Sequence, residues 1–155
     1  IDVACYPEAH PESKSYSSDV DFFKRKVDAG ANSAITQYFY NPDAYFRFVD
    51  YCRTAGIDIP IVPGIMPITN YANLARFSAS CGAEIPRWLD KRLKGFGDDK
   101  ESLRSFGIDV VTELCEDLLQ GGAPGLHFYS MNLSQAVTQI WTNLDLGNRP
   151  QRELL

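Results

Sequence analysis

The chain has few of the residues that build metal centres or disulfide frameworks. Its 155 residues include four cysteines and two histidines. The cysteines are widely spaced, and none forms a CxxC pair or a Cys/His pair with metal-ligand spacing. The sequence therefore predicts no metal site. It favours reduced, buried thiols in a cytoplasmic protein for all four, which are Cys5, Cys52, Cys81 and Cys115.

Basic charge and long apolar runs are also scarce. The 15 Lys and Arg residues are outnumbered by 20 Asp and Glu, so a broad basic face for nucleic acid is not expected. No apolar run approaches the roughly 18–20 residues of a membrane span, and no signal peptide is recognisable. We therefore expect neither nucleic acid nor a membrane as a partner. The first residue is Ile1, which fits processing, a shortened chain or an earlier part that is missing.

The chain does contain alternating apolar runs and amphipathic segments, which is typical of parallel βα units. Strands are predicted at 1–6, 33–40, 58–63 and 125–130. Eight strands close an ordinary barrel, so residues 1–155 are predicted to form a single segment, half of a (β/α)8 TIM barrel. A four-stranded doubly wound sheet is the alternative, although no glycine-rich turn follows the first strand.

Capping residues indicate where the helices begin and end. Ser18 with Asp21 is a capping pair for the first helix, and Gly30 is its C-terminal glycine. The same kinds of signal mark later helices at Asn41, Pro42, Gly56 and Asn70. An extra helix, PRWLDKRLKGFG, precedes the longest one. The longest helix has an apolar face made of Ile108, Val111, Leu114, Cys115 and Leu118.

Polar side chains follow the predicted strands, at the end where parallel α/β folds hold their ligands. The first strand leads into CYPEAHPESKS, whose prolines favour a stiff, extended loop. Gln37 offers an acceptor and two donors to a planar heterocycle or to a neighbouring loop. Phe77 is expected either to pack in the core or to stack on a ligand. For His127, which lies between Leu126 and Phe128, a position in the core is favoured over a catalytic role. The remaining candidates are Tyr6, Glu8, His10, Thr36, Tyr38, Tyr129 and Asn132.

No catalytic triad or phosphate loop is recognisable, which leaves cofactor chemistry, where the protein supplies shape, hydrogen bonds and stacking. At this point four stretches, taken in order, resemble the methylenetetrahydrofolate reductase family: ACYPEAHPES, KRKVDAGANSAITQYFY, IVPGIMPITNYANLARF and HFYSMN. The resemblance runs from Ile1 to about Gly147 and corresponds to strands five to eight of that family's barrel, with the N-terminal half absent.

The resemblance implies reduction of 5,10-methylenetetrahydrofolate to 5-methyltetrahydrofolate, with FAD as hydride carrier and NAD(P)H as donor. This reaction belongs to one-carbon metabolism and methionine biosynthesis. The implied cofactor-binding residues are Tyr6, His10, Asp19, Arg25, Lys26, Ala31 and Ile35. The implied substrate-binding residues are Gln37, Asn73 and Phe77. No catalytic residue is implied in this segment, because the family's proton donor belongs to the other half.

Three residues depart from the family pattern. Phe22 stands where many members have an asparagine, Asn73 where a glutamine is common, and Leu133 where an arginine often meets the folate. A homo-oligomer is expected, and the segment alone is expected to be inactive. The alternatives are a non-catalytic half-barrel that pairs with itself or with another half, and an α/β domain that binds an unrelated small molecule.

Overall fold

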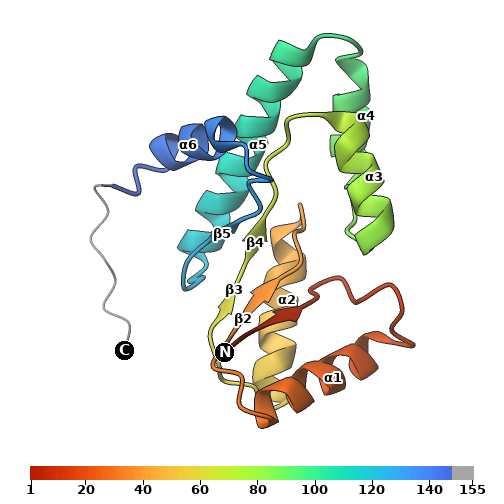
Figure 1. Ribbon diagram of the computed structural model, residues 1–155, viewed down its shortest axis with the longest axis vertical. Coiled ribbons are helices and arrows are strands. Elements are labelled where there is room, and N and C mark those ends of the chain that lie inside the picture. The colour runs from red at the N-terminus through yellow and green to blue at the C-terminus, as the bar shows by residue number, and fades with distance from the viewer. Residues whose placement is uncertain (148–155) are drawn as a thin grey trace.

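Helices and short parallel strands alternate along the chain (Figure 1). The computed structural model describes residues 1–147, and the tail 148–155 lies outside the described residues. Every strand pair in the described range is parallel, which confirms the predicted α/β class. The elements are β1 (Asp2–Cys5), α1 (Tyr16–Asp28), β2 (Ser33–Thr36), α2 (Pro42–Thr54), β3 (Ile61–Val62), β4 (Gly64–Ile65), α3 (Tyr71–Cys81), α4 (Arg87–Gly95), α5 (Lys100–Gln120), β5 (His127–Phe128) and α6 (Ser134–Asn143).

The strands form two small sheets that follow one another in chain order. The first has the order β1-β2-β3, and the second pairs β4 with β5. Pro63 separates β3 from β4, because proline has no N–H to donate to a neighbouring strand. The predicted strand 58–63 is therefore replaced by β3 and β4 on either side of Pro63. The Pro63-Gly64 pair in the sequence predicts that the strand ends or bends at this point, and the structure confirms this prediction.

Regular strand is shorter than predicted elsewhere too. The strand predicted at 33–40 ends at Thr36, and the one predicted at 125–130 contains only His127 and Phe128. Residues 38–40 are Tyr-Phe-Tyr, and all three side chains are buried. Aromatic residues suit strands and buried loops alike, so composition alone could not show where backbone pairing stops.

A close contact joins the two sheets. The hydroxyl oxygen of Thr36 accepts a hydrogen bond from the Gly64 N–H at 2.9 Å, and the Tyr129 hydroxyl donates to the Thr36 carbonyl at 2.9 Å. A Cβ on Gly64 would collide with that carbonyl and with the Tyr129 ring. The junction therefore requires glycine, because only glycine leaves room for the two backbones to approach.

The predicted helix signals are confirmed with one correction. Ser15, rather than Ser18, is the N-cap of α1. The Ser15 side chain accepts from the Ser18 N–H, and the Ser18 side chain accepts from the Ser15 N–H, both at 3.1 Å. This reciprocal pair places Ser18 where a capping box has its N3 residue, so the proposed pairing with Asp21 is wrong. The signals confirmed by the structure are Gly30, Asn41, Pro42, Gly56 and Asn70.

Helices α1 and α2 cover one face of the first sheet. By register, that face carries Cys5, Ala34 and Ile61, which are all buried. Phe23 of α1 stacks on Phe48 of α2, with ring centroids 5.9 Å apart. This packing explains why the two helices are amphipathic.

The opposite face of the first sheet carries Ala4, Ile35 and Val62 in register. Ala4 is exposed, and the other two are half-buried. Apolar side chains on adjacent strands therefore form a sheet face that the described residues leave partly uncovered.

Between β4 and β5 the chain makes the predicted helical excursion, α3 to α5, and no strand lies within 86–120. The predicted apolar face of α5 is confirmed, with Ile108 half-buried and the other four side chains buried. At Gly107 a Cβ would collide with the carbonyl oxygen of Ile68. Helix α5 thus lies directly against the loop that follows β4, and it supports one side of the candidate site.

All four cysteines are free, as predicted. Cys5, Cys52 and Cys115 are buried, but Cys81 is half-exposed at the end of α3, which corrects the expectation that all four would be buried. Within residues 1–147, no group of three or more His, Cys, Asp or Glu side chains is arranged to hold a metal ion. No helix in this part of the chain is long and apolar enough to cross a membrane.

Candidate ligand pocket at the strand ends

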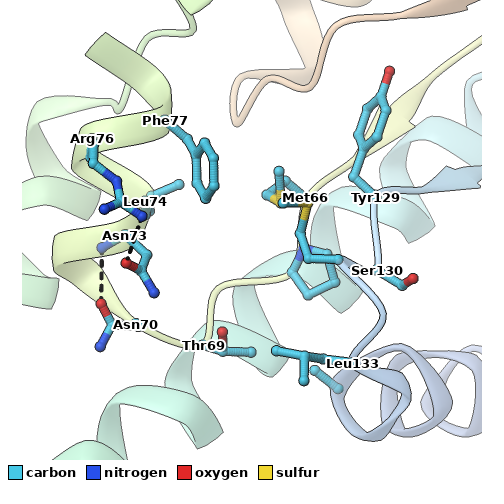
Figure 2. A pocket seen from close by; sticks show the side chains of 13 residues that line it. Met66, Thr69, Asn70, Asn73, Leu74, Arg76, Phe77, Tyr129, Ser130 and Leu133 are labelled. Carbon is cyan, nitrogen blue, oxygen red and sulfur yellow. Dashed lines mark hydrogen bonds between the residues drawn. The ribbon is translucent and has the colours of Figure 1, made fainter. Parts of the chain in front are cut away.

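A pocket of about 240 Å³ opens beside α3 (Figure 2). Four segments line it: the loop at 66–70 after β4, the first half of α3, the loop at 129–133 after β5, and α6 through Ala136. Two of these segments directly follow strand ends. The carboxyl ends of parallel strands are where α/β proteins commonly bind small molecules, which makes this pocket the candidate site.

The aromatic ring of Phe77 projects from α3 into the pocket and faces Met66 on the opposite side (Figure 2). Its side chain is half-buried. The guanidinium carbon of Arg76 lies 5.4 Å from the centroid of the Phe77 ring, a cation–π distance. An aromatic face opposite a polarisable thioether suits a flat, unsaturated ligand. We call this cavity the Phe77 pocket.

Polar groups on the same face of α3 border the Phe77 pocket. The Asn73 side-chain oxygen accepts a hydrogen bond from Arg76 at 3.3 Å, and the Asn70 side chain caps the helix through the Asn73 N–H at 2.9 Å. Arg76 makes no ion pair within residues 1–147. Arg76 is not among the residues predicted from the sequence, although its spacing from Asn73 and Phe77 places all three on one helical face.

Buried tyrosines support the Phe77 pocket from behind. The Tyr38 hydroxyl lies 3.0 Å from the Ser78 hydroxyl, and the Tyr40 hydroxyl donates to the Met66 carbonyl at 3.1 Å. Burial is the largest cause that raises the pKa of Tyr38, of Tyr40 and of Tyr129. These phenols therefore stay neutral at physiological pH, and those of Tyr40 and Tyr129 donate hydrogen bonds to backbone carbonyls.

Gln37 lies in a different recess from Phe77. Its side-chain oxygen accepts a hydrogen bond from the Tyr38 N–H at 3.1 Å. The recess that it lines also includes Tyr6 and Cys81. The structure therefore brings Gln37 together with the loop after β1 and does not bring it into the Phe77 pocket.

The loop at 6–15 is tied to α1 through Asp19. One Asp19 oxygen accepts from the His10 N–H at 3.1 Å, and the other accepts from the Ser13 hydroxyl at 3.0 Å. The rings of Tyr6 and His10 meet edge to face, with centroids 4.7 Å apart. Three of the predicted cofactor-binding residues therefore form one cluster.

The same loop is also tied to the connection between α3 and α4. The Glu8 carboxylate accepts from the Glu84 N–H at 2.8 Å. Burial is the main cause that raises the Glu8 pKa, and the bond from Glu84 opposes it. Pro11 lies against Gly82, where a Cβ would be too close to the proline ring. The loop thus bridges α1 and the end of α3.

Two predicted cationic residues lie further along α1. The Lys26 ammonium donates to the Ala4 carbonyl at 2.8 Å. This carbonyl points away from β2, since the neighbouring carbonyl of Cys5 is the one that accepts from the β2 side. Lys26 therefore caps the open edge of β1. The Arg25 guanidinium carbon lies 5.3 Å from the centroid of the exposed Phe22 ring.

Ala31 and Ile35, two other predicted cofactor-binding residues, lie apart from the cluster of Tyr6, His10 and Asp19. Ala31 is buried just before β2, at the amino end of the sheet, so Tyr6 and Ala31 are at opposite ends. Ile35 lies on the partly uncovered sheet face. His127, for which the sequence favoured a core position, is half-buried, and its ring centroid lies 5.0 Å from that of Tyr129.

The fold and pocket define a parallel α/β protein with a candidate ligand pocket at the carboxyl ends of two of its strands. A family model described as methylenetetrahydrofolate reductase matches residues 1–145. The chain belongs to the methylenetetrahydrofolate reductase family, which confirms the resemblance seen in the sequence.

Individual relatives agree with this assignment. The 5,10-methylenetetrahydrofolate reductase of Escherichia coli (strain K12) is 42% identical over 150 residues, which cover 97% of this chain and 50% of the relative. Methylenetetrahydrofolate reductase (NADH) 1 of Arabidopsis thaliana is 42% identical over 155 residues, covering 94% of this chain and 26% of the relative. The chain therefore spans about half the length of the bacterial relative.

A solved structure shares the fold. It is an uncharacterized protein from Clostridium thermocellum that binds two copies of 5-methyl-5,6,7,8-tetrahydrofolic acid. The TM-score is 0.59 at 22% identity, and the match covers 93% of this chain and 52% of the other.

Proposed function

We propose that this chain supplies the folate pocket and one wall of the FAD site of a flavin-dependent methylenetetrahydrofolate reductase. The observation that carries the proposal is the Phe77 pocket, in which an aromatic ring faces Met66 at the strand ends of a chain from this family. A folate joins a flat pterin through aminobenzoate to glutamate. Its aromatic part can stack on Phe77, and its polar groups can reach Asn73.

Gln37 is proposed to hold the pterin or the nicotinamide ring. Its oxygen is occupied by the Tyr38 N–H, while its amide nitrogen makes no hydrogen bond within the described part of the chain. Two donor hydrogens therefore remain for the acceptor atoms of a planar ring. The orientation of the amide is held by the backbone of its own neighbour.

The residues beside β1 fit part of an FAD molecule. Arg25 and Lys26 make no ion pair within residues 1–147, and their charge suits the FAD pyrophosphate. Asp19 holds the Tyr6–His10 wall and keeps further lone pairs for a ribose hydroxyl. Ile35 supplies apolar surface on the partly uncovered sheet face. When bound, FAD carries hydride from NAD(P)H to the folate.

The strand order supports a half-barrel. In doubly wound sheets the first strand lies inside the strand order, whereas β1 lies at the edge here. The partly uncovered face with Ala4, Ile35 and Val62 would then line the barrel interior. We further propose that the protein acts in the cytoplasm, where its four free thiols stay reduced.

The folate site is tested by calorimetric titration of the 155-residue chain with 5-methyltetrahydrofolate. Phe77→Ala should weaken binding by at least about tenfold, because a stacking aromatic is lost. Trp88→Ala is the matched control, since Trp88 is a 56% exposed aromatic on α4. Absence of saturable binding, or equal binding by Phe77→Ala, contradicts the folate site.

The reductase activity is tested by joining this chain to the half of the Escherichia coli relative that it does not match. The joined protein should oxidise NADH or NADPH with a folate acceptor, whereas the chain alone should not. A joined protein that binds FAD but does not turn over would contradict the reductase. A chain that self-associates, as sedimentation would show, and binds neither FAD nor folate would instead support the non-catalytic half-barrel.

A further inference from the structure

We propose that Lys100 and Arg104 of α5 bind the carboxylates of the substrate's glutamate tail, in a groove that continues the Phe77 pocket. This inference rests on the proposed folate substrate. It assigns a binding site to the part of the folate that the Phe77 pocket does not hold. A folate has an apolar aromatic end and an anionic end, so it needs two adjoining surfaces of different chemistry.

The groove has a volume of about 1060 Å³ and lies between α5 and α6. Thr69, Leu133 and Ala136 line both this groove and the Phe77 pocket. The tight contact of Gly107 with Ile68 holds α5 beside the loop from which Thr69 comes. The two cavities are therefore neighbours, and the proposed path of the ligand runs from Phe77 past Leu133 into the groove.

The cations of the groove come from one face of α5. Lys100 and Arg104 are four residues apart, a spacing that places them on the same side of a helix. Both are exposed, and neither makes an ion pair within residues 1–147. An arginine guanidinium can donate two parallel hydrogen bonds to one carboxylate, and a lysine ammonium can bind the next.

Two acidic side chains, Glu101 and Asp109, also line the groove. Glu101 lies in the first turn of α5, where the positive end of the helix offsets its charge. Asp109 lies more than a turn beyond Arg104 along α5. The first turn of α6, which has no side-chain cap, adds peptide N–H groups on the other side of the groove.

The test compares two ligands, 5-methyltetrahydropteroate, which has no glutamate, and the triglutamate form of 5-methyltetrahydrofolate. The unchanged protein should bind the triglutamate about tenfold more tightly, and this advantage should fall as salt concentration rises. The double variant Lys100→Gln/Arg104→Gln should lose most of the advantage while its affinity for the tail-free ligand stays the same. Circular dichroism verifies that the exposed substitutions leave the fold intact.

Two further variants sharpen the test. Arg87→Gln removes an exposed cation of α4 that makes no ion pair in the described residues, and it should keep the full advantage of the triglutamate. Asp109→Asn removes an opposing charge and should increase that advantage.

The possible failures are distinguishable. If the unchanged protein binds neither ligand, the proposed folate site fails. If it binds both ligands equally, or if the double variant keeps the advantage, the folate site stands and the tail subsite is overturned. An advantage that is smaller or unchanged in Asp109→Asn also counts against the subsite.

Discussion

Two regions at strand ends use their polar side chains in opposite ways. In the loop at 6–15, Asp19 accepts two hydrogen bonds from the loop, and Glu8 accepts one from the Glu84 N–H. In the Phe77 pocket, Arg76 donates one hydrogen bond, to the exposed Asn73, lies over an aromatic ring and makes no ion pair in the described residues. Polar residues at a strand end can therefore either hold the chain together or remain available to a ligand, and their hydrogen-bond partners distinguish the two.

If this contrast is correct, substitutions in the loop should mainly lower the free energy of unfolding, while substitutions in the pocket should mainly weaken ligand binding. The junction at Gly64 connects the two sheets that carry these regions. A substitution at Gly64 should therefore lower the free energy of unfolding more than a substitution in either region.

Gly64→Ala should have the largest effect on stability. The added Cβ collides with the Thr36 carbonyl and the Tyr129 ring, so the two sheets must separate. Overpacking of this kind costs about 3 kcal/mol, measured as the free energy of unfolding in urea. Gly125→Ala is the control, because a Cβ there meets no atom within 4 Å. Equal stability of the two variants would show that the junction does not join the sheets.

Asp19→Ala should have the next largest effect. It leaves the His10 N–H and the Ser13 hydroxyl without their acceptor, which costs about 2 kcal/mol of unfolding free energy. Faster amide exchange at His10 should accompany the loss. Asp21→Ala, an exposed carboxylate on the same helix, should change neither quantity. A stable Asp19→Ala protein would mean that Asp19 does not hold the loop.

Phe77→Ala should lower the free energy of unfolding by only about 1 kcal/mol, because its ring is half-buried. The fully buried Phe39 provides the contrast, and Phe39→Ala should cost about 3–5 kcal/mol. Urea unfolding of the ligand-free protein measures both. If Phe77→Ala is as damaging as Phe39→Ala, Phe77 is a core residue rather than a binding surface.

Glu8→Gln should have the smallest effect and the opposite sign. Burial raises the pKa of Glu8 above the ordinary glutamate value of 4.5. The stability that the neutral carboxyl contributes is therefore fully present below pH 4.5 and is lost as the pH rises through the raised pKa. Glutamine can still accept from the Glu84 N–H without a buried charge. At pH 7 the variant should therefore be slightly more stable, and its stability should vary less with pH above 4.5. A less stable variant would mean that the charge itself strengthens the contact.

Some features of the candidate site were accessible from sequence and others were not. The place of Phe77 on the helix that follows the third predicted strand was evident from the alternation of strands and helices. The role of Asp19 in the loop did not, because its two partners, His10 and Ser13, are set by the path of the chain before α1. Arg76 could have been found from helical spacing, but spacing alone does not show which face of α3 meets a cavity.

The sequence by itself determined the parallel α/β class, the family and most helix ends, because local signals such as Asn41 before Pro42 act within a single turn. Only the tertiary structure decided that a separate strand after Pro63 pairs with β5, that Gln37 and Phe77 occupy separate recesses, and that a cation-bearing groove adjoins the Phe77 pocket. The reason is that these features depend on contacts between residues far apart in the chain, such as Thr36 with Tyr129 and Gly107 with Ile68. Periodicity and capping carry no information about such contacts, since they report only which face of each element is apolar.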